Sequence, residues 1–163
     1  MDTAALPDQA GSLAKPGESA YDAFISYSHA ADGRLAPALQ RELERFGKRL
    51  FQRRALHIFR DETNLSASPE LWTSIVGHLN CARWLLLMAS PTASTSKWIK
   101  REIQWWLEHR SAENILLLIT DGDVVWDEGA NDFNWDATTA IPRALSGAFK
   151  NEPLWVDLRW AHA

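Results

Sequence analysis

The sequence predicts an α/β fold with a central five-stranded parallel sheet. Short apolar runs that suit buried strands recur along the chain, and longer segments with apolar residues at helical spacing separate most of them. Right-handed crossovers between parallel strands place helices on both faces of a sheet. The expected architecture is therefore a three-layer α/β/α, flavodoxin-like arrangement.

The first strand is predicted at YDAFISYS, residues 21–28, a run of β-branched and aromatic side chains. A helix is predicted from residue 32 to residue 47 because apolar residues recur there at helical spacing (Leu35, Leu39, Leu43 and Phe46). Gly47 is expected to end this helix. A short strand, LHIF at residues 56–59, follows it.

The second helix is expected to begin at Pro69, with Ser68 as its cap. WLLLMAS, residues 84–90, is a continuous apolar run typical of a central parallel strand. The third helix lies in STSKWIKREIQWW, residues 94–106, with Ser96 as its cap. ILLLIT, residues 115–120, is a further buried strand.

The last part of the chain is less regular. Residues 121–151 are acidic and irregular, with a short helix expected over residues 142–149 and a final strand over residues 153–158. The segment is expected to cover a site, form an oligomer contact or serve as a loop, and its pattern does not choose among these roles.

Length and composition limit the kind of protein. The chain has 163 residues, enough for one domain, which we place at residues 21–160 behind a flexible leader at residues 1–20. A net charge of −4 argues against nucleic acid and anionic membrane as main partners. A lone cysteine, Cys81, excludes a disulfide framework and favours a cytoplasmic location. The longest apolar runs are too short to span a bilayer.

Ligands of such sheets bind outside the carboxyl ends of the strands. Three polar segments are predicted to meet at that edge: SYSH at residues 26–29, RDETNL at residues 60–65 and SPTASTS at residues 90–96. No metal cluster, glycine-rich phosphate loop or Ser–His–Asp order stands out in the sequence.

Three motifs in order, YDAFISYSH, FRDETNLSAS and SKWIKREIQWW, resemble a TIR (Toll/interleukin-1 receptor) domain of the bacterial, NAD-cleaving type. The resemblance covers about residues 21 to 160. It implies assembly through TIR–TIR contacts and cleavage of NAD+ at the nicotinamide–ribose bond. The glutamate that enzymatic members carry one turn after a tryptophan corresponds to Glu102, which follows Trp98.

Helical spacing, independently of the motif, places Trp98 and Glu102 on the same side of their helix. Trp98, Glu102, Trp105 and His109 form a stripe between the predicted core stripe and the solvent-facing stripe. A glutamate at the core's edge is partly desolvated, which raises its pKa and strengthens its field. Without the motif, the same residue suits an ordinary helix-surface ion pair.

The chemistry suits a site with one carboxylate. Nicotinamide is a cationic leaving group that departs neutral, so no general acid has to protonate it, whereas ordinary glycosidases use a pair of carboxyl groups. Glu102 is expected to stabilise the oxocarbenium-like transition state. Trp98 is expected to form an aromatic wall for a flat ring, although ordinary packing explains it equally well.

Five further residues at the same edge are candidates for binding NAD+, which is expected as the substrate with no cofactor or metal. Hydroxyls and backbone amides at the end of the first strand suit ribose or phosphate, and Arg60 suits the pyrophosphate or a pair with a neighbouring carboxylate. These candidates are Ser26, Tyr27, Ser28, Arg60 and Asp61. His29 is expected to be a solvent-exposed loop residue.

Two other functions compete with this one. A non-catalytic adaptor would act through TIR–TIR contacts alone and would not need Glu102. A phosphoacceptor receiver domain needs an acidic pair after the first strand, where this chain has SYSH. The enzymatic interpretation places the domain in bacterial immune signalling or defence, activated by self-association, with a fused or partner sensor domain.

Overall fold

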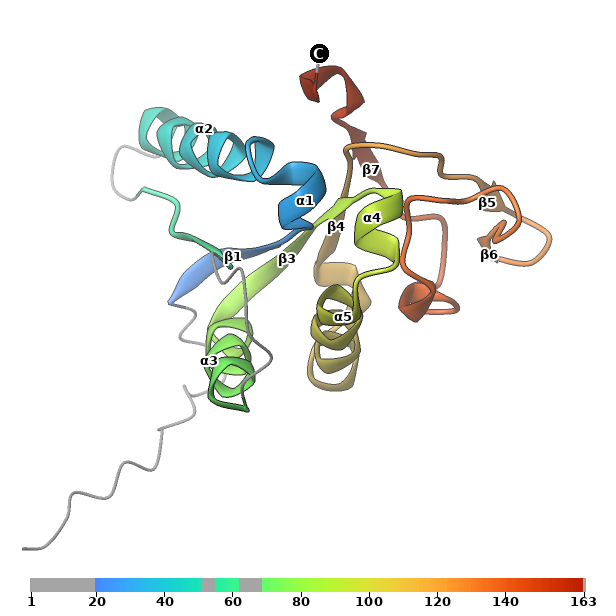
Figure 1. Ribbon diagram of the computed structural model, residues 1–163, viewed down its shortest axis with the longest axis horizontal. Helices are drawn as coiled ribbons and strands as arrows, with labels where there is room; N and C mark the ends of the chain where they lie inside the picture. The colour runs from blue at the N-terminus through green and yellow to red at the C-terminus, as the bar shows by residue number, and fades with distance from the viewer. Residues whose placement is uncertain (1–19, 51–54, 62–68, 163) are drawn as a thin grey trace, which may run out of the picture.

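The computed structural model describes residues 20–50, 55–61 and 69–162 (Figure 1). The predicted leader, apart from residue 20, lies outside them. The helices are α1 (His29–Asp32), α2 (Leu35–Leu50), α3 (Pro69–Asn80), α4 (Pro91–Ser94) and α5 (Lys97–His109), with 3₁₀ turns η1 (Ala112–Asn114), η2 (Arg143–Leu145) and η3 (Arg159–His162). The strands are β1 (Tyr21–Ser26), β2 (Ile58–Arg60), β3 (Ala82–Ala89), β4 (Ile115–Ile119), β5 (Trp126–Asp127), β6 (Asp132–Phe133) and β7 (Trp155–Asp157).

Five parallel strands form the central sheet in the order β2-β1-β3-β4-β7. β3 lies in the middle and pairs with β1 on one side and β4 on the other, which suits its continuous apolar run. The expected three-layer fold and five-stranded parallel sheet are confirmed.

Helices cover both faces of the sheet, with α1 and α2 on one face and α3 and α5 on the other (Figure 1). Side chains alternate between the faces along each strand. Phe24 of β1 belongs to the core cluster beneath α3 and α5, whereas Ile25 and Tyr27 belong to the cluster beneath α2. The side chains of consecutive residues near the end of a strand therefore lie on opposite faces of the sheet.

Several helix boundaries differ from the prediction. α2 runs through Gly47 to Leu50, so Gly47 is not a stop. A Cβ on Gly47 would lie 2.6 Å from Leu56 Cγ, and the glycine is therefore needed for the close approach of α2 to the segment before β2. The short helices α1 and α4 were not expected, although Ser28 and Ser90 stand at their N-caps.

The acidic segment between β4 and β7 forms a small lobe beside α5 (Figure 1). It contains the hairpin of β5 and β6, and the helix expected over residues 142–149 is reduced to the turn η2. Phe133 is the centre of its aromatic core, and it packs edge-on against Trp126, Trp135 and Phe149. The connection from β4 to β7 is therefore a folded unit rather than an open loop.

No helix in the described part of the chain is long and apolar enough to cross a membrane.

Candidate functional site

Glu102 lies on the inner side of α5 and is almost completely buried, with 3 % of its surface exposed. The Ser26 hydroxyl, at the end of β1, donates a hydrogen bond to the Glu102 carboxylate. The sequence placed Glu102 at the edge of the core with partial shielding. The carboxyl group is buried more deeply than that because the carboxyl end of β1 lies against this turn of α5.

Burial has a large electrostatic effect on this carboxyl group. It raises the pKa of Glu102 from 4.5 to about 8, because the charged form loses its contact with water. The hydrogen bond from Ser26 lowers the pKa, and the negative charge of Asp61 raises it. Glu102 is therefore mostly protonated at neutral pH.

Asp61 follows β2 and acts on the face of the sheet that holds Glu102. Its charge raises the pKa of Glu102 and also that of His78, whose pKa burial lowers overall. The His78 ring stacks on Phe59 with 3.8 Å between ring centroids. Asp61 is thus part of the electrostatic environment of Glu102.

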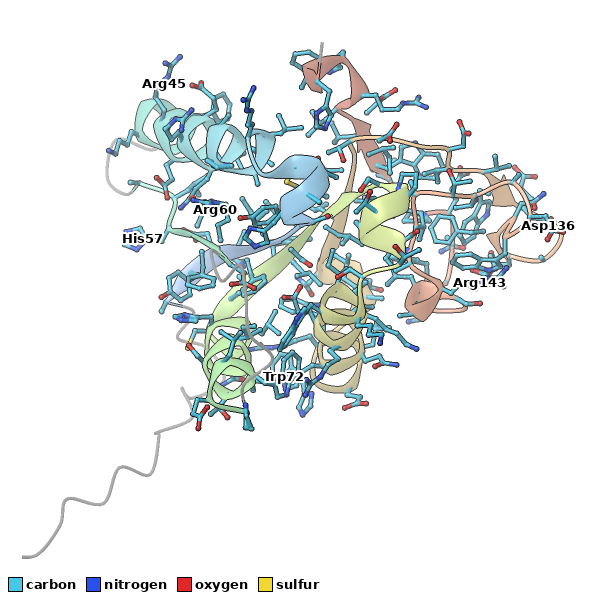
Figure 2. The ribbon with its side chains drawn as sticks, in the orientation of Figure 1. Arg45, His57, Arg60, Trp72, Asp136 and Arg143 are labelled. Atoms are coloured by element: carbon cyan, nitrogen blue, oxygen red, sulfur yellow. The ribbon has the colours of Figure 1, made fainter. Side chains whose placement is uncertain are left out.

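Trp98 lies one turn before Glu102 on α5 and is half-buried against the core. Its ring centroid lies 6.1 Å from that of Trp72 on α3, and the Arg101 guanidinium lies over both rings. Trp72 is seen between the two helices in Figure 2. Trp98 therefore belongs to an aromatic contact between the first turns of α3 and α5.

Arg60 and Tyr27 lie on the opposite face, beneath α2 (Figure 2 labels Arg60). Arg60 Nη1 donates to the Tyr27 hydroxyl at 3.0 Å, and Arg60 Nε donates to Gln40 Oε1 at 3.0 Å. The Tyr27 hydroxyl also lies 3.3 Å from His29 Nδ1. These side chains join α2 to the ends of β1 and β2, and the structure does not bring them to Glu102.

Ser28 has a local role at the same edge. Its hydroxyl accepts a hydrogen bond from the Ala31 amide at 3.4 Å and so caps α1. Of the six side chains proposed to assist Glu102, the structure groups Ser26, Asp61 and Trp98 on the α5 face. It places Tyr27 and Arg60 beneath α2, and Ser28 at the α1 cap.

Three residues near this edge were missed by sequence reasoning. Nothing in the helical pattern separates Trp72 or Arg101 from ordinary residues of their helices. Asp32, in α1, is fully buried, and its Oδ1 lies 3.0 Å from His162 Nε2. The two residues are 130 positions apart in the chain, which explains why no local pattern revealed the pair.

Among the residues that the structure describes, no group of three or more His, Cys, Asp or Glu side chains is arranged to hold a metal ion.

The chain is similar in sequence to known TIR-like proteins. Residues 24–123 match the family model described as the Thoeris protein ThsB, TIR-like domain. The NAD(+) hydrolase ApTIR of Actinoplanes sp. (strain SE50/110) is 50% identical over 143 residues, which cover 88% of this chain and 20% of that protein. The chain thus spans about a fifth of the length of the curated relative that it matches.

Among solved structures, the TIR domains of the activated Roq1 resistosome, which directly recognises the pathogen effector XopQ, align with a TM-score of 0.46 at 20% identity. That alignment covers 62% of this chain and 59% of the other. The family match extends from β1 beyond β4 and includes Ser26, Trp98 and Glu102. By this match over most of its length, the chain belongs to the family of TIR-like domains.

Proposed function

We propose that the domain is an NAD+ nucleosidase that cleaves the nicotinamide–ribose bond, with Glu102 as its catalytic residue. The observation that carries the proposal is a buried carboxyl group beside the carboxyl end of β1, hydrogen-bonded by Ser26. The name of the half-identical relative, NAD(+) hydrolase ApTIR, supports the choice of substrate.

The proposed reaction replaces the bond from C1′ to nicotinamide with a bond from C1′ to the oxygen of water. The bond between C1′ of the ribose and N1 of nicotinamide breaks, and its electron pair goes to the nicotinamide ring, which leaves neutral. Water adds to C1′ and releases a proton, which gives ADP-ribose. Because the ring departs without accepting a proton, a single carboxylate meets the electrostatic demand of the oxocarbenium-like transition state.

Burial makes Glu102 effective in this role. A carboxylate in a site of low dielectric attracts a positive charge more strongly than one in water. The approaching nicotinamide cation favours the ionised form of Glu102, so binding of NAD+ lowers the pKa of that group. The Ser26 hydroxyl then donates to a charged carboxylate and holds it in one orientation.

Trp98 supplies a flat apolar surface next to this carboxylate in the proposed complex. An indole ring of this kind attracts a flat cation through the negative face of its π system. The charged nicotinamide ring of NAD+ is such a cation, and the neutral product is held less strongly. Trp98 thereby favours binding of the substrate over retention of nicotinamide.

The proposal includes the partners and setting expected from the sequence. NAD+ acts as a substrate, and no cofactor is needed for the chemistry. Self-association through TIR–TIR contacts activates the domain, and a fused or partner sensor domain controls that step. We place its action in the cytoplasm in bacterial defence, with ADP-ribose or a cyclic ADP-ribose variant as the product.

The experiment measures nicotinamide release from NAD+ over a range of protein concentrations. Wild-type protein is expected to release nicotinamide with a rate per molecule that rises with concentration, and Glu102→Gln is expected to abolish release. Glu102→Gln keeps the volume of the side chain and its ability to accept from Ser26, so a loss of rate reports the loss of charge.

Glu108→Gln on the exposed side of the same helix is the matched control, and it is expected to keep full activity. Release by Glu102→Gln at the wild-type rate would contradict the proposal. No release by the wild-type protein at any concentration would instead favour the adaptor function.

A further inference from the structure

Arg101 is an exposed cation held in a fixed orientation between α3 and α5. Its guanidinium carbon lies 4.1 Å from the Trp72 ring centroid and 5.5 Å from the Trp98 ring centroid. Stacking on aromatic faces orients the plane of a guanidinium while leaving its N–H groups pointing outward. Within the described part of the chain, Arg101 donates to no protein group.

The position of this cation relative to the carboxyl edge follows from the topology. Helices that connect parallel strands run back across the sheet, so the first turns of α3 and α5 lie at the carboxyl edge. Trp72 belongs to the first turn of α3, and Trp98 and Arg101 belong to the first turns of α5. The stacked guanidinium therefore lies at the edge where a ligand enters, next to the proposed wall of the site.

The other arginine proposed for the site is already engaged elsewhere. Arg60 donates to Tyr27 and Gln40 beneath α2, on the face of the sheet away from Glu102. A dinucleotide whose nicotinamide ribose lies at Glu102 carries its diphosphate one methylene group away from that ribose. The diphosphate then needs a donor on the α5 side of the sheet.

We propose that Arg101 binds the diphosphate of NAD+ and that Trp72 and Trp98 hold its guanidinium in position for this contact. The inference rests on the proposed function, because it concerns the same substrate at the same site. A planar guanidinium donates two parallel hydrogen bonds to phosphate oxygens, and its stacked orientation reduces the rotamer entropy lost on binding. Arg101 thus selects a dinucleotide over a nucleoside that carries the same nicotinamide ribose.

The test compares two ligands that each contain one part of NAD+. Titration calorimetry measures the dissociation constants of ADP-ribose, which keeps the diphosphate, and of nicotinamide riboside, which lacks it. Arg101→Ala is expected to weaken ADP-ribose binding roughly tenfold to hundredfold, the cost of losing a charge-assisted contact. Binding of nicotinamide riboside is expected to stay within about twofold of wild type.

Two further variants separate charge from geometry. Arg101→Lys keeps the charge but loses the planar fork, and an intermediate loss of ADP-ribose binding is expected. Lys100→Ala removes an exposed cation from the other side of α5 and is expected to bind both ligands as the wild type does. Steady-state kinetics of Arg101→Ala with NAD+ should show a raised KM and a kcat within about twofold of wild type.

Each outcome decides between explanations. Equal weakening of both ligands by Arg101→Ala would show that the arginine only supports Trp98, and it would overturn the inference. Unchanged ADP-ribose binding, or no ADP-ribose binding by the wild type, would overturn it as well. Absence of nicotinamide release by wild-type protein would overturn the proposed function itself, and the kinetic experiment above detects that failure separately.

Discussion

The Ser26 hydroxyl at the end of β1 donates a hydrogen bond to the Glu102 carboxylate on α5. This contact joins residues that are 76 positions apart in the chain, and it is the polar partner that the structure gives to this buried acid. A buried carboxyl group costs free energy when it ionises unless hydrogen bonds or positive charge compensate. The proposed substrate supplies the positive charge, and Ser26 supplies the hydrogen bond.

The pH dependence of the reaction is the first consequence. Since the ionised form of Glu102 is the active form in the proposed mechanism, kcat/KM should rise about tenfold per pH unit and level off near pH 8, the pKa of the free enzyme. The value of kcat should level off at lower pH, because bound NAD+ carries a positive charge that lowers the pKa of Glu102. Initial rates of nicotinamide release between pH 5.5 and 9.5, roughly the range over which Glu102 titrates, test both statements. A profile that is flat across this range would contradict them.

Ser26→Ala should move this profile to higher pH. Removal of the hydroxyl removes an interaction that lowers the pKa of Glu102, and a hydrogen bond to a charged group is worth enough to shift the pKa by about one unit or more. The midpoint of the kcat/KM profile is the measurement. A shift to lower pH would show that the hydroxyl does not stabilise the charged carboxylate.

Asp61→Asn should move the profile in the opposite direction. The negative charge of Asp61 raises the pKa of Glu102, so its neutralisation lets Glu102 ionise at lower pH. The same substitution should lower the pKa of His78, since Asp61 raises it. Histidine proton shifts in NMR spectra recorded against pH report the second change independently of activity. An unchanged pKa of His78 would mean that Asp61 does not act on this face of the sheet.

The sequence predicted the sheet well because the evidence for it is local. WLLLMAS and ILLLIT, which contain most of β3 and β4, are continuous apolar runs that suit buried parallel strands in any tertiary context. The stripe that contains Trp98 and Glu102 also followed from helical periodicity alone. The depth at which Glu102 is buried could not be predicted, because it depends on how closely the end of β1 approaches α5.

The face of the sheet on which Arg60 lies could not be predicted from the sequence either. Ile58 and Phe59 are both apolar, so the alternation that would assign one of them to each face is missing from the sequence. Their packing decides the question: Ile58 joins the core beneath α2, and Phe59 packs against the core beneath α3. Arg60 accordingly lies on the same face of the sheet as Ile58, beneath α2. Asp61 acts on the opposite face, where Glu102 lies.

The raised pKa of Glu102 also predicts how folding stability depends on pH. Between about pH 4.5 and about pH 8 the native state holds a proton that the unfolded chain releases, so this group makes stability fall as the pH rises through that window. Glu102→Gln cannot ionise and should remove this contribution. Its advantage in unfolding free energy over wild type should therefore grow by up to roughly 1.4 kcal/mol per pH unit in this window. Urea unfolding at several pH values tests this, and a constant difference would contradict it.

Two glycines with positive φ provide a matched pair for stability. Gly122 has a φ of 80°, and a Cβ there would lie 2.8 Å from Thr139 Oγ1 and 2.9 Å from the Pro91 ring. Gly147 has a φ of 66°, and no heavy atom lies within 4 Å of the position of its Cβ.

Gly147→Ala should cost only the backbone strain, about 1–2 kcal/mol. Gly122→Ala should cost the same strain plus about 1–3 kcal/mol for displacing the neighbouring atoms, since Pro91 belongs to α4 and cannot move freely. Thermal unfolding measures both variants, and equal losses would mean that Thr139 and Pro91 accommodate a Cβ at position 122 without cost.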